Sequence, residues 1–127
     1  MKGCVRHCCF PTWNGLLNVS CALALRAKGL RDPRVVVLCG DAELNEGSNW
    51  EAILLAPQLR LGNLTLLVID NDSSSLKMSP WGARLGSFGW DVHVVGGHDQ
   101  RALERALRVR HPGQPVAVVA DIPEGEW

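Results

Sequence analysis

The chain has 127 residues, of which 46% are hydrophobic and 20% charged, and its 13 basic side chains balance 13 acidic ones. These proportions indicate a single compact globular domain and exclude a disordered or fibrous chain. A net charge of zero argues against broad nucleic-acid binding, which requires surplus Lys and Arg. No apolar run approaches the ~20 residues that span a bilayer, and residues 1–10 lack the apolar stretch of a secretory signal. We therefore expect no nucleic-acid or membrane partner and a cytoplasmic location.

The first 14 residues contain a cluster of possible metal ligands, namely Cys4, His7, Cys8 and Cys9. A structural zinc site usually requires a second ligand pair at a set spacing, and none is evident downstream. Cysteines in a cytosolic chain are by default reduced, and they are often buried as small apolar groups. We therefore favour reduced thiols over a zinc site.

The first half of the chain predicts one buried helix and two buried strands. Residues 15–29 are apolar on nearly all sides and end at a glycine, which is typical of a buried helix. Residues 34–39 form an apolar, β-branched run, and residues 64–69 form another. Continuous apolar strands of this length are typical of a parallel sheet that is covered on both faces.

A second helix is expected between these two strands. Ser48 and Glu51 have the spacing of a capping box, which predicts a helix over residues 48–61. Pro57 lies inside that helix and should kink it, because proline removes a backbone hydrogen bond. Residues 71–90 read as a loop of ~20 residues, a length that in compact domains is usually functional or mobile.

The last third of the chain predicts strands at residues 91–95 and 115–120, with a helix over residues 99–110 that Asp99 caps. Strands alternating with helices predict an α/β domain, with a parallel sheet and helices on both faces. We expect one such domain over residues 1–127.

Polar side chains follow the first two predicted strands. Asp41 comes directly after one strand, and Asn71 comes just after the other. If these strands are neighbours, both side chains lie at the carboxyl edge of the sheet, where ligands bind in open α/β folds. Carboxylate and amide oxygens are hard ligands that suit Mg²⁺ or Ca²⁺, and Mg²⁺ keeps positions free for substrate phosphates. The sequence therefore predicts a metal site that holds a phosphorylated ligand.

Other phosphate-binding motifs fit less well. The chain has neither a Gly-x-x-x-x-Gly-Lys-Ser/Thr loop nor a Gly-x-Gly-x-x-Gly motif after a strand. A phospho-receiver domain also gathers acidic residues around magnesium, but it needs a lysine near the end of a later strand, and none is suitably placed. A plain magnesium-dependent phosphate-binding module remains an alternative.

The segment from residue 40 to 52, GDAELNEGSNWEA, followed by Asn71, resembles the thiamine-diphosphate motif of transketolases, Gly-Asp-Gly with a later Asn. The similarity extends over residues 15–120, through LGNLT at 61–65, FGWDV at 88–92 and GHD at 97–99. Residues 1–14 diverge from the family. The resemblance implies the thiamine-diphosphate-binding fold, specifically its diphosphate-binding domain, with residues 71–90 as a long active-site loop.

The resemblance also implies roles for individual residues. Asp41, the Asn71 side chain and the Ser73 backbone carbonyl would ligate Mg²⁺ or Ca²⁺, which would bridge the diphosphate of thiamine diphosphate. Three further residues, Gly40, Ala42 and Glu43, would belong to the cofactor-binding segment, with the backbone of Gly40 and Ala42 against the diphosphate.

Two acidic residues and one departure from the family motif complete this assignment. Glu46 and Glu51 match residues that join a carboxylate network between the two active sites of a transketolase dimer, although capping alone would explain Glu51. Ala42 stands where glycine is usual, and its methyl group is tolerated only if the backbone φ is negative.

By resemblance, the chain is the diphosphate half of a two-carbon ketol-transfer (carboligation) enzyme. Its partner would be a separate pyrimidine-binding-domain subunit that supplies the activating glutamate, in an α2β2 heterotetramer. A ketose phosphate is the expected donor, with a 2-oxo acid undergoing decarboxylation as the alternative. A degenerate, non-catalytic regulatory subunit that binds thiamine diphosphate is a second alternative.

Overall fold

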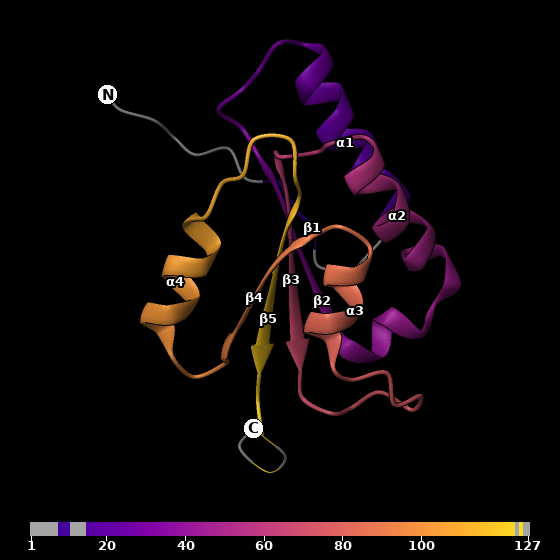
Figure 1. Ribbon diagram of the computed structural model, residues 1–127, viewed down its shortest axis with the longest axis vertical. Helices are drawn as coiled ribbons and strands as arrows, with labels where there is room; N and C mark the ends of the chain where they lie inside the picture. Colours follow the sequence, from indigo (N-terminus) through magenta and orange to yellow (C-terminus); the bar gives the residue numbers. More distant parts are fainter. Residues whose placement is uncertain (1–7, 11–14, 124, 126–127) are drawn as a thin grey trace.

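A computed structural model describes residues 8–10, 15–123 and 125, and all structural statements concern these residues. The described strands form one sheet in the order β1-β2-β3-β5-β4, with every neighbouring pair parallel (Figure 1). The strands are β1 (Cys8–Phe10), β2 (Val35–Gly40), β3 (Leu64–Asp70), β4 (Asp91–Gly96) and β5 (Val116–Asp121). The predicted α/β class with a parallel sheet is confirmed.

Helices cover both faces of the sheet, as expected. Three of them, α1 (Gly15–Ala27), α2 (Gly47–Gln58) and α3 (Trp81–Ser87), lie on one face, and α4 (Gln100–Arg108) lies on the other (Figure 1). The chain moves in one direction across the sheet from β1 to β4 and then returns to β5. Because parallel crossovers are right-handed, the returning connection places its helix on the opposite face.

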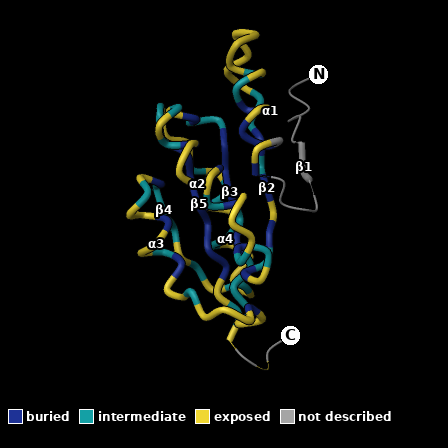
Figure 2. Tube along the Cα trace, turned by 90° about the vertical axis from the view of Figure 1, so that its right-hand side faces the viewer, coloured by how far each residue is buried: buried dark blue, intermediate teal, exposed yellow. Residues whose placement is uncertain are grey.

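The core lies mainly between the sheet and α1, α2 and α3. Alternate residues of β2 and β3 point into it, because successive strand side chains point to opposite faces; on β2 these are Val35, Val37 and Cys39. A smaller cluster under α4 contains Ala106, Val116 and Val118. The central strands are accordingly the most buried part of the trace (Figure 2).

Three local expectations differ from the structure. Strand β1 was not anticipated from the sequence, and residues 81–87 form α3 inside the segment read as a loop. Helix α2 begins at Gly47 with Glu46 at its N-cap position, so Ser48 and Glu51 do not form a capping box. The Ser-x-x-Glu spacing lies within the helix instead, because the chain already turns helical through the preceding 3₁₀ segment.

A residue distant in sequence compensates for the helical hydrogen bond that Pro57 cannot make. It lies in the last turn of α2, where its missing N–H leaves the carbonyl of Ile53 without its usual helical partner. The indole Nε1 of Trp90 donates to that same carbonyl at 2.8 Å. The segment preceding β4 thus satisfies the backbone group that the proline leaves open.

The cap of α4 and the packing of three tryptophans are further local features. The side chain of Asp99 accepts a hydrogen bond from the Ala102 N–H at 2.9 Å, so it caps α4 as predicted. Trp81 and Trp90 are buried in the core, and Trp50 stacks on Trp81 with ring centroids 6.2 Å apart. Within the described part of the chain, no helix is long and apolar enough to cross a membrane.

Candidate functional site

The carboxyl ends of β2 and β3 lie side by side at one edge of the sheet. Gly40, the last residue of β2, is in register with Ile69 on β3. A short 3₁₀ helix, η1 (Asp41–Asn45), follows β2, and residues 71–80 follow β3. The topology therefore places the two polar segments together, as the sequence predicted.

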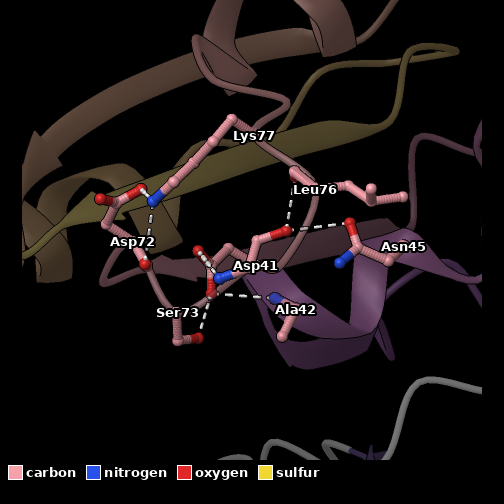
Figure 3. A network of polar contacts seen from close by, with 8 residues as sticks. Asp41, Ala42, Asn45, Asp72, Ser73, Leu76 and Lys77 are labelled. Atoms are coloured by element: carbon pink, nitrogen blue, oxygen red, sulfur yellow. Dashed lines mark hydrogen bonds and ion pairs between the residues drawn. The ribbon is translucent and has the colours of Figure 1, made fainter.

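Asp41 is the buried centre of this edge, with only 1% of its surface exposed. Its Oδ1 accepts hydrogen bonds from the Ala42 N–H at 2.9 Å and from the Ser73 hydroxyl at 2.6 Å. Its Oδ2 accepts from the Ser74 N–H at 3.1 Å (Figure 3). Each carboxylate oxygen has two lone pairs, so Oδ1 is fully used and Oδ2 keeps one lone pair for a further partner.

Two other predicted ligands come from the segment that follows β3. The half-buried side chain of Asn71 makes no hydrogen bond to any described residue. Ser73 contacts Asp41 through its hydroxyl, which the sequence did not predict. Its backbone carbonyl accepts no hydrogen bond within the described part of the chain. The Asn71 amide oxygen and the Ser73 carbonyl oxygen thus have no hydrogen-bond partner among the described residues.

Ser74 is a site residue that the sequence reading missed. It is buried, and its Oγ lies 2.9 Å from Asn45 Oδ1 and 2.7 Å from the Leu76 carbonyl (Figure 3). A hydroxyl has a single proton, so these two acceptors share one donor. Ser74 ties the loop after β3 to η1. The polar run from residue 70 to 75 was the signal, but it did not distinguish which serine turns inward.

The residues predicted to contact a diphosphate lie where β2 ends and η1 begins. Glu43 Oε2 accepts the Gly40 N–H at 2.7 Å, and the Glu43 carbonyl accepts from Asn49 Nδ2 at 2.7 Å. Ala42 is exposed and does not have a positive φ. The methyl group at this position is therefore free of the backbone strain that a left-handed conformation would impose.

Glu46 and Glu51 are exposed, and they do not join the Asp41 network. Glu46 occupies the N-cap position of α2 without a side-chain capping bond. Glu51 projects from the same helix. Neither acid has a structural role among the described residues, which leaves both free for contacts outside this chain.

Asp70 adds a second carboxylate at the end of β3, in register with Asp121 on β5. Burial raises the pKa of Asp70, and the charges of Asp41 and Asp121 raise it further, against hydrogen bonding with the Trp81 side chain and the Asp72 backbone. Exposed Asp72 forms an ion pair with Lys77 at 2.5 Å (Figure 3). This edge of the sheet is thus negatively charged and attracts cations.

The expected donors are a carboxylate, an amide and a carbonyl. The described residues contain no group of three or more His, Cys, Asp and Glu side chains that could hold a metal by themselves. The Cys4, His7, Cys8 and Cys9 cluster lies outside the residues whose side chains are described. Its interpretation as reduced thiols stays a prediction.

A family model described as the thiamine diphosphate binding domain of transketolase matches residues 22–119. The chain belongs to the transketolase family. The resemblance seen in the motif at residues 40–52 and in Asn71 is therefore confirmed at the level of the family, and the domain is one that binds thiamine diphosphate.

Curated relatives agree with this assignment. The chain is 41% identical over 108 residues to a protein named "Ferredoxin fas2" from Rhodococcoides fascians, covering 84% of the chain and 35% of that protein. It is 37% identical over 121 residues to one subunit of an apulose-4-phosphate transketolase from Actinobacillus succinogenes, covering 86% of the chain and 43% of that protein. The transketolase-family chain thus spans less than half the length of these relatives.

Solved structures show the same fold. A transketolase R525L mutant from Pichia stipitis superposes with a TM-score of 0.68 at 28% identity, covering 84% of this chain and 18% of that one. A thiamin diphosphate-dependent enzyme from Mycobacterium smegmatis gives a TM-score of 0.64 at 24% identity, which supports the fold alone. The domain described here corresponds to a small part of a full-length transketolase.

Proposed function

We propose that this chain is the diphosphate- and metal-binding component of a split, cytoplasmic transketolase-like enzyme that transfers a two-carbon ketol unit. The observation that carries the proposal is the buried carboxylate of Asp41, held by three donors with one lone pair of Oδ2 unused. A carboxylate oriented in this way at the end of a parallel strand is suited to binding a cation. Family membership supports thiamine diphosphate as the cofactor that this cation would accompany.

The residues at this edge fit the metal. Asp41 Oδ2, the Asn71 amide oxygen and the Ser73 carbonyl would hold Mg²⁺ or Ca²⁺, both of which prefer oxygen ligands. The backbone of Gly40 and Ala42 would lie against the diphosphate. The bound cofactor supplies the carbanion-stabilising chemistry, whereas the protein supplies binding, orientation and electrostatics.

The proposal includes a partner polypeptide that carries the pyrimidine-binding domain. The Actinobacillus succinogenes relative, which this chain matches over 43% of its length, is named as one subunit of a transketolase, and that name supports a division between polypeptides. An α2β2 heterotetramer would place the exposed carboxylates of Glu46 and Glu51 in a network that crosses the dimer interface. The expected donor substrate is a ketose phosphate.

Two alternatives predict different behaviour. A thiamine enzyme that decarboxylates a 2-oxo acid would use the same diphosphate site with another donor. A degenerate regulatory subunit would bind thiamine diphosphate without turnover. The intact network around Asp41 and the unstrained backbone of Ala42 favour a catalytic component over a degenerate one.

The binding half of the proposal is tested by titrating the chain with thiamine diphosphate and Mg²⁺ in a calorimeter. Asn71→Ala is the cleanest variant, because its side chain supports no described hydrogen bond and its loss should leave the fold intact. We expect it and Asp41→Asn to weaken binding by about tenfold or more, the scale of a lost hydrogen bond to a charged group. Removal of Mg²⁺ with EDTA should weaken binding of the cofactor to the unaltered chain by at least as much.

Asp32→Asn is the matched control, since it removes one exposed carboxylate remote from the carboxyl edge of the sheet. Binding that survives in Asn71→Ala and Asp41→Asn, with circular dichroism unchanged, would contradict the proposed metal ligands. Mg²⁺-dependent binding of inorganic diphosphate as tight as that of thiamine diphosphate would instead favour the plain phosphate-binding module.

The catalytic half is tested by reconstitution with a polypeptide that carries a transketolase pyrimidine-binding domain. Ketol transfer from a ketose phosphate should require both polypeptides, and it should be lost in the Asp41→Asn complex. Turnover of a 2-oxo acid alone would establish the decarboxylating alternative. Full ketol transfer by the isolated chain would refute the need for a partner.

A further inference from the structure

A concave site lies at the edge of the sheet opposite Asp41, near the amino-terminal ends of the strands. It is a cavity of about 500 Å³. The residues that line it include no Asp or Glu. They do include a histidine, His111, and five arginines, namely Arg26, Arg31, Arg34, Arg60 and Arg110. A chain of zero net charge thus gathers five of its 13 basic side chains around one cavity.

These arginines converge from distant parts of the sequence. Arg26 lies near the end of α1, Arg31 and Arg34 in the turn before β2, Arg60 in the turn before β3 and Arg110 in the turn before β5. In a parallel sheet every helix returns to the same edge before the next strand begins. The fold therefore brings these turns together although the sequence separates them.

Contacts with backbone carbonyls explain part of this arrangement. Arg26 Nη1 donates to the Leu59 carbonyl at 2.5 Å, and Arg110 Nη2 donates to the Asp32 carbonyl at 3.1 Å. Cations near helix ends are stabilised by such carbonyls. A guanidinium has five N–H donors, however, so these bonds hold the arginines in place and leave most of their donors unused.

Arg26 Nη1 also reaches the Arg60 carbonyl, and Arg34 Nη1 the Val109 carbonyl, both at 3.4 Å, and the other side-chain donors of these arginines have no partner among the described residues. Arg34 Nε is buried without a hydrogen-bond acceptor, and Arg60 makes no hydrogen bond as a donor through its side chain. Burial, followed by the positive charge of Arg110, lowers the pKa of Arg34, the reverse of what a neighbouring carboxylate would do. Burial of like charges and of an unpaired N–H donor costs free energy. A bound anion would offset both costs.

We propose that this cavity binds a small phosphate-bearing anion. The planar fork of arginine matches phosphate oxygens in a bidentate arrangement. The volume of about 500 Å³ lies within the range of small-molecule sites, ~300–1,000 Å³. The site is separated from Asp41 by the length of the strands, so it is independent of the cofactor edge. Its ligand stabilises the folded chain by mass action.

The test uses inorganic phosphate and inorganic diphosphate as probes, in buffer free of divalent metals so that the cofactor edge does not contribute. Binding is followed by the ¹H–¹⁵N signals of the arginine Nε–H groups and by the melting temperature. We expect saturable binding, a shift of the Arg34 Nε–H signal and a higher melting temperature. Arg60→Gln and Arg110→Gln should each weaken binding by about tenfold or more, the scale of a charged hydrogen bond.

Arg101→Gln is the matched control, because it removes the same charge from the exposed start of α4, at the other edge of the sheet. Its affinity for both probes should equal that of the unaltered chain, as should the affinity of Asn71→Ala. The proposal is overturned by an equal response to sodium chloride at the same ionic strength, by binding that does not saturate, or by losses in Arg101→Gln or Asn71→Ala that match those in Arg60→Gln.

Discussion

The carboxylate of Asp41 both holds its neighbouring segments together and keeps one oxygen lone pair available to a ligand. Three donors fix its orientation while one lone pair of Oδ2 stays free. Asn71, its predicted companion, is free of described hydrogen bonds. The two residues predicted first from the sequence thus each keep polar capacity that no described residue uses. The Ser73 hydroxyl and the Ser74 N–H hold Asp41, and neither contact was predicted from the sequence.

Gly62 is a position where the folded chain has no room for a side chain. A Cβ at this residue would lie 2.3 Å from the His111 carbonyl oxygen and 2.7 Å from the Gly113 nitrogen. Both contacts are with backbone, which has little freedom to move. Gly62→Ala should therefore lower the free energy of unfolding by about 2 kcal/mol or more, as overpacking does.

Urea unfolding followed by circular dichroism measures this change. Gly96→Ala is the control, because a Cβ there meets no atom within 4 Å and its backbone has no positive φ. Its unfolding midpoint should stay within error of the unaltered chain. Equal midpoints for Gly62→Ala and Gly96→Ala would show that the turn at Gly62 does not pack against His111 and Gly113 as described.

At the scale of elements, α2 and the segment before β4 are coupled through one carbonyl. Pro57 cannot donate to Ile53, and Trp90 donates to it instead. Trp90→Phe should leave the Ile53 carbonyl buried without a partner, at a cost of about 1–3 kcal/mol beyond any loss of packing. In a Pro57→Ala background the restored N–H can bond Ile53, so the same substitution should cost less.

A double-mutant cycle in urea measures that coupling. We expect the cost of Trp90→Phe to fall by about 1 kcal/mol in the Pro57→Ala background, the net contribution of one hydrogen bond. Identical costs in both backgrounds would mean that the indole contributes packing alone. The bond from Trp90 accounts for a proline whose place in the sequence predicted only a kink in the helix.

At the scale of the whole molecule, charge is segregated along the strand direction. The carboxyl edge of the sheet holds Asp41, Asp70 and Asp121, whereas the opposite edge holds the arginine-lined cavity. A net charge of zero for the chain conceals this separation. One edge is thus suited to a cation with its diphosphate, and the other to an anion.

Cys39 reports on unfolding of the whole molecule, since it is 1% exposed in the main core. Alkylation of Cys39 by iodoacetamide should require global opening, so its rate in urea should follow the unfolding transition seen by circular dichroism. Half-buried Cys21 should react earlier through local opening of α1. Mass spectrometry of peptides separates the two sites, and native-state labelling of Cys39 at the rate of Cys21 would contradict a single cooperative core.

The sequence by itself determined four of the five described strands, the parallel sheet and the position of Asp41 and Asn71 just after the ends of two neighbouring strands. Those features depend on local patterns, namely apolar runs of strand length and polar residues at the points where adjacent strands end. The tertiary structure alone decided which serines hold Asp41, which indole satisfies Ile53 and which five arginines share a cavity. Each of these depends on how turns and helix ends far apart in the chain pack together, and no local pattern encodes that packing.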